Sequence, residues 1–180
     1  GKRIALYANI GSPSEAGAAH KMGAEGIGLF RSEYMFLNAS GLPTEEEQFD
    51  IYCAMLEKMK NEPVVVRTLD IGGDKLDQAL QRYAEPNPFL GLRGIRFCLK
   101  ERRDIFRTQL RALMRAGRYG NLKIMLPMVT CVEEIMDVRR LMNEIGEELQ
   151  EERIEYALHL PIGAMIETPA AALLAGPLAK

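Results

Sequence analysis

The sequence predicts an α/β fold built on a parallel sheet, and two observations support this prediction. Five short runs are apolar at nearly every position, which is typical of strands that are covered on both faces. Longer amphipathic stretches separate these runs, so that strand and helix alternate as right-handed parallel crossovers require. The predicted strands are residues 4–10, 26–30, 64–69, 122–129 and 162–166.

The amphipathic stretches carry recognisable helix-start and helix-stop signals. Pro13 is tolerated in the first turn of a helix, where an N–H would have no partner in any case. Thr44 can cap the next helix, and the glutamates at 45–47 lie at its positive end. Gly117 ends the third helix. The predicted helices start near residues 13, 45, 101, 131 and 169. The third runs to about residue 117, and the fourth, with Thr130 as its cap, runs to about residue 150. Thr168 directly precedes the start of the fifth.

The number of strand–helix units leaves two architectures open. Five units fit into 180 residues, whereas a closed (β/α)8 barrel takes ~250 residues. The chain is therefore either a complete doubly wound sheet or most of a barrel that has been cut. Position 1 is Gly rather than Met, and the last predicted helix is still running at Lys180. We expect a segment of a longer protein; a tag residue before an otherwise natural chain is the alternative.

Composition excludes several classes of protein. Hydrophobic residues make up 47% of the chain, which is enough for a full core and argues against disorder. The 23 Lys and Arg residues are balanced by 25 Asp and Glu, so no basic surface for nucleic acid is expected. No apolar run approaches the ~20 residues of a membrane helix. The widely spaced Cys53, Cys98 and Cys131 favour a reducing cytoplasm over a disulfide framework.

Charged side chains follow three of the predicted strands at the point where each strand ends. Arg31 follows Phe30 of the second run, Arg67 follows the valines at 64–66 of the third, and Glu167 follows Ile166 of the fifth. Ligands of α/β sheets and barrels bind outside the carboxyl ends of the strands. Arginine suits a bidentate grip on phosphate or carboxylate, and Mg²⁺ is usually held by one or two carboxylates plus phosphate oxygens. The pattern predicts a Mg²⁺-assisted phosphate or phosphoenol site.

The same side chains have structural alternatives. Glu167 precedes a predicted helix and could simply stabilise its positive end. The arginines could form ion pairs or a solvated basic patch instead of a ligand site. The alternative partners are Glu33 for Arg31, and Asp70 or Asp74 for Arg67, while Arg93 and Arg96 would form the patch.

The segment at 70–97 is too long for an ordinary connection of ~2–6 residues. It contains Gly72-Gly73 and a second glycine pair at 91 and 94. Long loops with glycines inside compact domains often carry function. The spacing does not match the G-x-x-x-x-G-K-[ST] pattern that cradles nucleotide phosphates, so the glycines could also serve only to turn the chain.

Five longer motifs in the chain resemble, in order, those of the phosphoenolpyruvate-utilising enzymes. The second and third favour the enzyme I branch of the bacterial sugar phosphotransferase system over pyruvate phosphate dikinase and phosphoenolpyruvate synthase. The motifs are GIGLFRSEYMF at 26–36, LPTEEEQF at 42–49, VVRTLDIGGDK at 65–75, NPFLGLRGIR at 87–96 and MIETPAAA at 165–172.

This resemblance implies that residues 1–180 are part of a phosphoenolpyruvate-binding (β/α)8 barrel, truncated to about five of its eight units. It implies that Arg31 and Arg67 bind the phosphate of phosphoenolpyruvate, that Arg93 lines the site, and that Glu167 is one of two carboxylate ligands of Mg²⁺. The full-length protein would be a cytoplasmic homodimer that transfers a phosphoryl group from phosphoenolpyruvate to its own histidine and then to the carrier protein HPr.

The resemblance also implies that several parts of the enzyme lie outside the chain. These parts are the phosphorylated histidine, the HPr-binding domain, the second metal ligand, a further arginine and the proton-donating cysteine. We therefore expect no catalytic residue within this segment and no activity of the segment alone. A different phosphoenolpyruvate-utilising enzyme and a non-catalytic, self-associating fragment are the alternatives.

Overall fold

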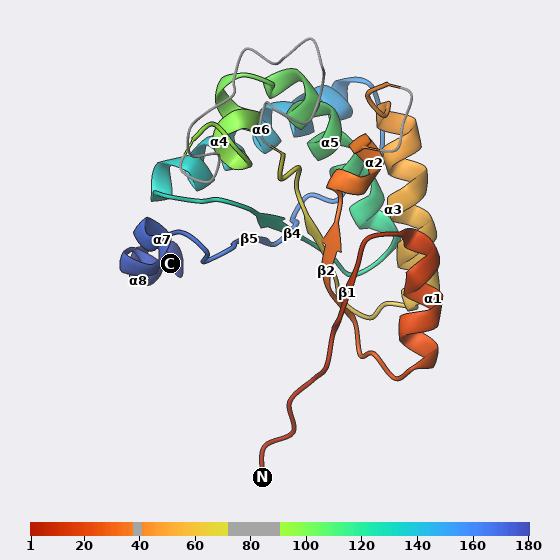
Figure 1. Ribbon diagram of the computed structural model, residues 1–180. Helices are drawn as coiled ribbons and strands as arrows, with labels where there is room; N and C mark the ends of the chain where they lie inside the picture. Colours follow the sequence, from red (N-terminus) through yellow and green to blue (C-terminus); the bar gives the residue numbers. More distant parts are fainter. Residues whose placement is uncertain (38–40, 72–90) are drawn as a thin grey trace.

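The computed structural model describes residues 1–37, 41–71 and 91–180, and its centre is a parallel sheet of five strands (Figure 1). Every neighbouring pair of strands is parallel. The strands are β1 (Ala8–Ile10), β2 (Ile27–Arg31), β3 (Val64–Arg67), β4 (Leu122–Leu126) and β5 (Ile162–Ala164), and they lie in the order β1-β2-β3-β4-β5.

The helices follow the strands as the sequence predicted, with two short additions, α2 and α4, and with the last predicted helix divided into α7 and α8. Within the described residues, no helix combines the length and the apolar character needed to cross a membrane. The helices are α1 (Pro13–Lys21), α2 (Glu33–Leu37), α3 (Glu45–Met59), α4 (Ile95–Lys100), α5 (Arg103–Ala116), α6 (Val132–Glu151), α7 (Pro169–Leu173) and α8 (Ala175–Leu178).

The predicted helix starts are confirmed with one correction. Thr44 caps α3 by accepting the Glu47 N–H, and Thr168 caps α7 by accepting the Ala171 N–H. Helix α6 is capped by Cys131 and not by Thr130. The Glu134 side chain accepts the backbone N–H groups of both Thr130 and Cys131, so the cap moves one residue along the chain.

The strand order decides between the two architectures that the sequence left open. A doubly wound sheet reverses its strand order and carries helices on both faces. Here the strands follow sequence order, and α1, α3, α5 and α6 cover a single face of the sheet (Figure 1). This is the winding of a (β/α) barrel, of which the described residues form five strands.

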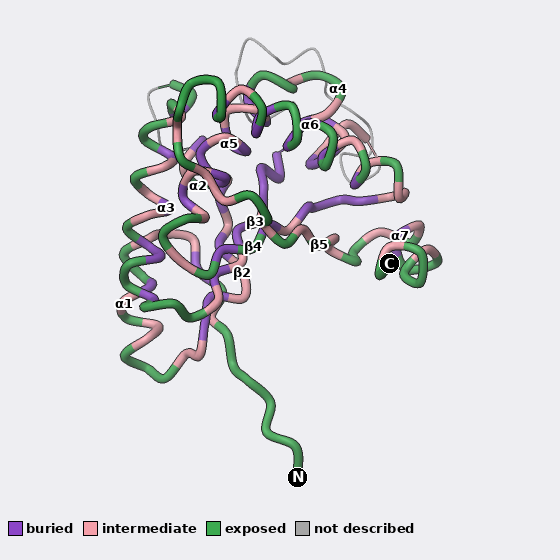
Figure 2. The backbone as a smooth tube through the Cα atoms, turned by 180° about the vertical axis from the view of Figure 1, so that it is seen from behind, coloured by how far each residue is buried: buried purple, intermediate pink, exposed green. Residues whose placement is uncertain are grey.

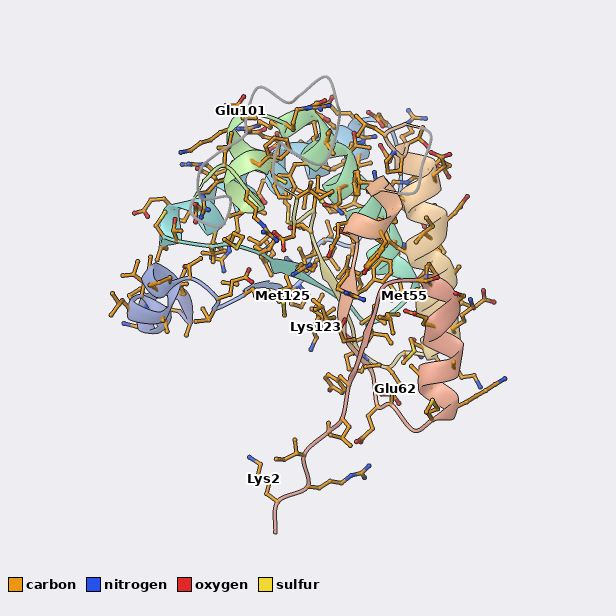
Figure 3. The ribbon with its side chains drawn as sticks, in the orientation of Figure 1. Lys2, Met55, Glu62, Glu101, Lys123 and Met125 are labelled. Carbon is orange, nitrogen blue, oxygen red and sulfur yellow. The ribbon has the colours of Figure 1, made fainter. Side chains whose placement is uncertain are left out.

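The prediction that the strands are covered on both faces is wrong for the described chain. Val64 and Val66 are fully buried against the helices, whereas Met125 is half-buried and Lys123 is exposed on the side away from them (Figure 3). Right-handed crossovers in one direction place every helix on the same face. Among the described helices, none of the four that cover the sheet lies over the other face, so its apolar residues are left without a helical layer from this part of the chain.

The first predicted strand is shorter than expected. Only Ala8–Ile10 pairs with β2, and the preceding Ile4 and Leu6 are 77% and 71% exposed. Figure 2 shows this segment leaving the body of the molecule as an exposed tail. The apolar character of residues 4–10 thus predicted a first strand that is longer than the observed β1.

The long segment predicted at 70–97 ends earlier, at the start of α4. Its residues 72–90 lie outside the described part of the chain.

An ion-pair cluster joins α3, α5 and α6 on the outer surface. Arg115 binds Glu45 and Glu46 at 2.7 and 2.8 Å. Arg111 binds Glu45 at 2.7 Å and also reaches Glu148 of α6 and Glu152, which directly follows that helix. The Arg115 guanidinium holds the pKa of Glu46 below its ordinary value of 4.5.

The lowered pKa of Glu46 predicts a pH-dependent contribution to stability. A depressed carboxyl pKa stabilises the fold above the unfolded-state value and loses that effect as pH falls through the folded-state value. We expect Arg115→Met to destabilise the protein near neutral pH and to matter less below about pH 4. Urea unfolding midpoints of both proteins at the two pH values test this. A midpoint difference that does not change with pH would contradict it.

Candidate phosphate-binding site

The predicted site residues lie at the carboxyl edge of the sheet. Arg31 and Arg67 end β2 and β3 and are register partners. Glu167 follows β5, whose Ala164 pairs with Leu126 at the end of β4. Since all the strands are parallel, their carboxyl ends meet at one edge, where ligands of such sheets bind.

Arg67 is held between two carboxylates. Its Nη2 donates to Glu33 Oε1 from α2, and its Nη1 lies 3.1 Å from Asp70 Oδ2. Asp70 also accepts from Arg93, at 3.0 Å from Nε and 3.3 Å from Nη2. The ion pair of Arg67 with Asp70 is therefore confirmed, and the alternative pairing of Arg31 with Glu33 is wrong. Asp74 lies outside the described residues.

We call Glu33, Arg67, Asp70 and Arg93 the ion-pair chain. The Asp70 side chain is only 4% exposed, so its two pairs form away from bulk water. A buried charge is tolerated when it is paired and hydrogen-bonded, and both oxygens of Asp70 meet this condition. The ion-pair chain therefore places two guanidinium groups in defined positions beside the strand ends.

Glu167 is fixed by the segment that follows β4. Its Oε1 accepts the Met128 N–H at 2.7 Å, and Met128 has a left-handed φ of 58°. The neighbouring Thr168 hydroxyl donates to the Val129 carbonyl at 2.7 Å. A left-handed conformation is uncommon for residues with a side chain and is often found at functional sites. These bonds join the ends of β4 and β5.

Arg93 and Glu167 line one cavity of about 400 Å³. Arg96 and Thr130 line it as well. Arg96 donates to the carbonyls of Gly91 and Met128, so it holds the loop together and is not part of a solvated basic patch. The cavity thus combines two guanidinium groups with a carboxylate, which is a suitable lining for a small anion with a cation.

Arg31 is placed apart from this cavity. Its guanidinium carbon lies 4.9 Å from the centre of the Tyr34 ring, a cation–π contact. It lines a different hollow with Asn9 and Glu15. The structure therefore links Arg67 to Arg93 through Asp70 and places Arg93 with Glu167 at one cavity. The Arg31 side chain lines the hollow beside α1 instead, although its backbone adjoins that of Arg67.

Four buried polar atoms at this edge have no hydrogen-bond partner among the described residues. They are Arg31 Nε, Glu33 Oε2, Arg67 Nε and Thr68 Oγ1. Buried polar atoms are almost always hydrogen-bonded in folded proteins. Atoms without a partner at the ligand-binding edge are those that a polar ligand or ordered water would satisfy.

Among the described residues that line the cavity, Glu167 is the one carboxylate that could bind a metal ion. The described residues include no group of three or more His, Cys, Asp or Glu that could hold a metal. Glu167 Oε2 has no hydrogen bond within the described chain, whereas Asp70 is occupied by two arginines. Because Mg²⁺ commonly takes one or two carboxylates and completes its shell with phosphate and water, Glu167 fits as one ligand of such an ion.

Sequence reasoning missed two features of the site. Glu33 was considered only as a partner of Arg31, and the bridging role of Asp70 between Arg67 and Arg93 was not predicted. The contacts join residues that are 23 and 34 positions apart. The only sequence signal for Glu33 was its position two residues after Arg31, within the same motif.

Cys53 and Cys98 are thiols at neutral pH. Burial raises the pKa of Cys53 to about 11, and it raises the pKa of the fully buried Cys98 as well. Cys98 Sγ donates to the Leu69 carbonyl at 3.7 Å. Because the thiolate is the nucleophile, both residues are packing residues, as the sequence suggested for Cys53.

The chain resembles known proteins along its whole length. The family described as PEP-utilising enzyme, PEP-binding domain, matches residues 1–180. The phosphoenolpyruvate-protein phosphotransferase of Bacillus sp. (strain S) is 51% identical over 180 residues, which is 100% of this chain and 31% of that protein. The protein of the same name from Bacillus subtilis (strain 168) is 47% identical, with the same coverage.

Two further likenesses are more distant or less complete. The multiphosphoryl transfer protein of Rhodobacter capsulatus is 46% identical over 180 residues, which is 100% of this chain and 21% of that protein. A crystal structure of 2,3-dimethylmalate lyase, of the PEP mutase/isocitrate lyase superfamily, aligns with a TM-score of 0.37 and 10% identity, covering 93% of this chain and 66% of that one. The chain spans about a third of the length of the phosphotransferases, since it covers 31% of each.

The chain thus matches one family over residues 1–180. It also carries arginines at two strand ends and has the strand order of a barrel. The chain belongs to the phosphoenolpyruvate-utilising enzymes, and the region it matches is their phosphoenolpyruvate-binding domain.

Proposed function

We propose that this chain is the phosphoenolpyruvate-binding part of a longer phosphotransferase of the enzyme I type. The intact enzyme would transfer the phosphoryl group of phosphoenolpyruvate to a histidine of its own and then to HPr. Relatives of about 50% identity that are named phosphoenolpyruvate-protein phosphotransferase support this proposal. The chain covers 31% of those relatives, so the histidine and the HPr-binding region are proposed to lie in other domains.

The observation that carries the proposal is the ion-pair chain beside the cavity that Glu167 lines. Phosphoryl transfer spreads charge over three equatorial oxygens and needs mainly positioning and electrostatic stabilisation. Guanidinium groups held in place before the reaction supply both, because little reorganisation is needed as charge develops. Arg67 would bind the phosphate, and Arg93 would line the site on the side of the cavity.

Arg31 is proposed as the second phosphate ligand. Its Cα is the register partner of that of Arg67, so both side chains start from neighbouring positions on the same edge. Its Nε and that of Arg67 are buried without partners in the described chain. A phosphate between the two arginines would satisfy both groups, with Arg31 leaving its contact with Tyr34.

Glu167 would hold the Mg²⁺ that the family resemblance implies. A bound Mg²⁺ would supply positive charge to the phosphate and carboxylate oxygens of phosphoenolpyruvate. Within this chain, the task of Glu167 is to present Oε2 while its Oε1 stays bound to the Met128 N–H. The remaining protein ligand would come from outside this segment.

The setting of the enzyme is also part of the proposal. The three cysteines are free thiols, which suits the reducing bacterial cytoplasm. There the enzyme would act as a homodimer and would drive sugar uptake through phosphorylated HPr. Among the described residues, none is assigned the role of nucleophile or proton donor, and the segment alone would be inactive.

The proposed function can be tested by phosphoryl transfer with the full-length gene product. Labelled phosphoenolpyruvate with Mg²⁺ should label the protein and then added HPr, without any nucleotide. Labelling that requires ATP or AMP would favour a dikinase-type enzyme instead. No transfer from phosphoenolpyruvate to protein under either condition would exclude the proposal. For the isolated chain we expect no transfer, and sedimentation at several concentrations would show whether it self-associates.

Replacing Glu167 with glutamine should raise the Mg²⁺ concentration needed for half-maximal activity by at least about tenfold. The amide of the Glu167→Gln variant keeps an oxygen for the Met128 N–H but lacks the negative charge that Mg²⁺ prefers. The measurement is the rate of phosphoryl transfer in a Mg²⁺ titration. Glu155→Gln is the matched control, because Glu155 pairs with Arg118 on the surface and its side chain is 75% exposed. An unchanged Mg²⁺ requirement in Glu167→Gln would remove Glu167 from the metal site.

A further inference from the structure

A buried amide connects the two chain segments that carry Arg31 and Arg67. Gln109 of α5 is 0% exposed. Its Oε1 accepts the backbone N–H of Leu69 at 2.9 Å, and its Nε2 donates to the Ser32 hydroxyl at 3.0 Å. The same Nε2 lies 3.2 Å from the Tyr52 hydroxyl. The amide group of Gln109 therefore forms hydrogen bonds with three groups, which follow β2, follow β3 and lie on α3.

These contacts determine the orientation of the amide. A primary amide offers two N–H donors and one carbonyl acceptor. The Leu69 N–H can only donate, so the carbonyl oxygen of Gln109 must face it. Both amide hydrogens then point to the hydroxyl groups of Ser32 and Tyr52. An apolar side chain of similar length would leave all three partners without this bond.

The partners of Gln109 are next to the proposed ligands. Ser32 lies between Arg31 and Glu33, and Leu69 lies between Arg67 and Asp70. Gln109 thus joins the turn after β2 to the turn after β3 at the level where the arginines leave the sheet. Within the strands, β2 and β3 are joined by the backbone hydrogen bonds of the sheet. Among the described residues, this pairing does not continue beyond Arg31 and Arg67.

The third partner anchors this network to the core. The Tyr52 hydroxyl lies 3.4 Å from Gln48 Oε1, and Gln48 Nε2 donates to the Pro43 carbonyl at 3.1 Å. Tyr52 and Gln48 are both 0% exposed. Fully satisfied polar networks of this kind specify one arrangement, because any displacement leaves a buried group unpaired.

We propose that Gln109 is a positioning residue for phosphoryl transfer, which sets the spacing between the segments of Arg31 and Arg67. The proposal rests on the proposed function of the site. Gln109 touches neither arginine in a bond of its own and acts through Ser32 and Leu69. A misplacement of about 1 Å between reacting groups can lower a rate by about 10²-fold, so this spacing matters for the two arginines.

The test is Gln109→Met in the full-length protein. Methionine has a similar length and no strong hydrogen-bonding group, so the packing is kept while all three bonds are lost. We expect kcat for phosphoryl transfer from phosphoenolpyruvate to fall at least about tenfold, while KM changes less. Leu113→Ala is the control, since Leu113 is a fully buried residue of the same helix that contacts the core. It should lower the thermal midpoint without this loss in kcat.

A double-mutant cycle separates positioning from general loss of stability. If Gln109 acts through Ser32, the effects of Gln109→Met and Ser32→Ala on kcat should be less than additive, whereas those of Leu113→Ala and Ser32→Ala should add. If the wild-type protein is active and the Gln109→Met variant retains a normal kcat, this inference is wrong and the proposed function is unaffected. Additive effects in both cycles would also overturn this inference. A wild-type protein without phosphoenolpyruvate-dependent transfer would instead overturn the proposed function.

Discussion

Replacing Arg67 with alanine should lower kcat/KM for phosphoenolpyruvate in the full-length enzyme at least about tenfold, since loss of one electrostatic donor in a preorganised site costs ~3–4 kcal/mol. Arg67 is the guanidinium that Glu33 and Asp70 hold at the end of β3. Without it the phosphate loses a ligand, and two carboxylates are left near an anionic substrate. Initial rates of HPr phosphorylation over a range of phosphoenolpyruvate concentrations measure this effect.

Two control variants make the Arg67 result interpretable. Arg67→Lys keeps the charge but loses the planar fork, so it should recover only part of the activity. Arg111→Ala removes an arginine with a similar exposure, 14% against 12%, and with several ion pairs, on the outer surface. It should leave kcat/KM unchanged. Near-normal turnover of Arg67→Ala would refute the assignment of Arg67 as a phosphate ligand.

Asp70→Asn should affect stability as well as activity. Asp70 is the shared partner of Arg67 and Arg93, and its side chain is 4% exposed. Removing one member of a buried ion pair costs about 3–5 kcal/mol, because the remaining charge stays buried without compensation. We expect a loss of about 3 kcal/mol in the free energy of unfolding, together with a fall in kcat, because neither guanidinium keeps its position.

Chemical unfolding and steady-state rates test the Asp70 prediction together. The control is Asp104→Asn, because Asp104 pairs with Arg102 but its side chain is 66% exposed. An exposed pair of this kind contributes about 1 kcal/mol or less, so the control should change unfolding little and activity not at all. If Asp70→Asn behaves like the control in both measurements, the ion-pair chain does not organise the site.

The helix boundaries show how far local signals reach. The sequence predicts Thr44 as a cap because the bonds that a cap makes lie within three residues of it. It also predicts that a helix starts at Thr168-Pro169, and the structure shows Thr168 as the cap of that helix. At α6 the predicted cap, Thr130, is one residue away from the observed N-cap position, Cys131. Glu134 accepts the backbone N–H groups of both residues, so the local signal does not distinguish them. Helices α2 and α4, of five and six residues, are too short for periodicity to reveal them.

The sheet shows where local signals stop. An apolar run at 4–10 has strand character throughout, yet only Ala8–Ile10 finds a partner in β2. Whether a residue pairs or stays exposed depends on the length of the neighbouring strand, which the run itself does not contain. Likewise, a run that is apolar on both faces does not say whether a second layer covers both. The winding of the crossovers decided that here.

The sequence alone determined the alternation of strands and helices and the resemblance to the family that residues 1–180 match. It also placed Arg31, Arg67 and Glu167 at the ends of strands. These properties depend on residue types at short spacing. Only the tertiary structure decided that Glu33 binds Arg67, that Asp70 bridges to Arg93, and that Gln109 joins the two turns. Such partners lie 23 to 77 positions apart, and strand register and helix packing determine which distant side chains meet.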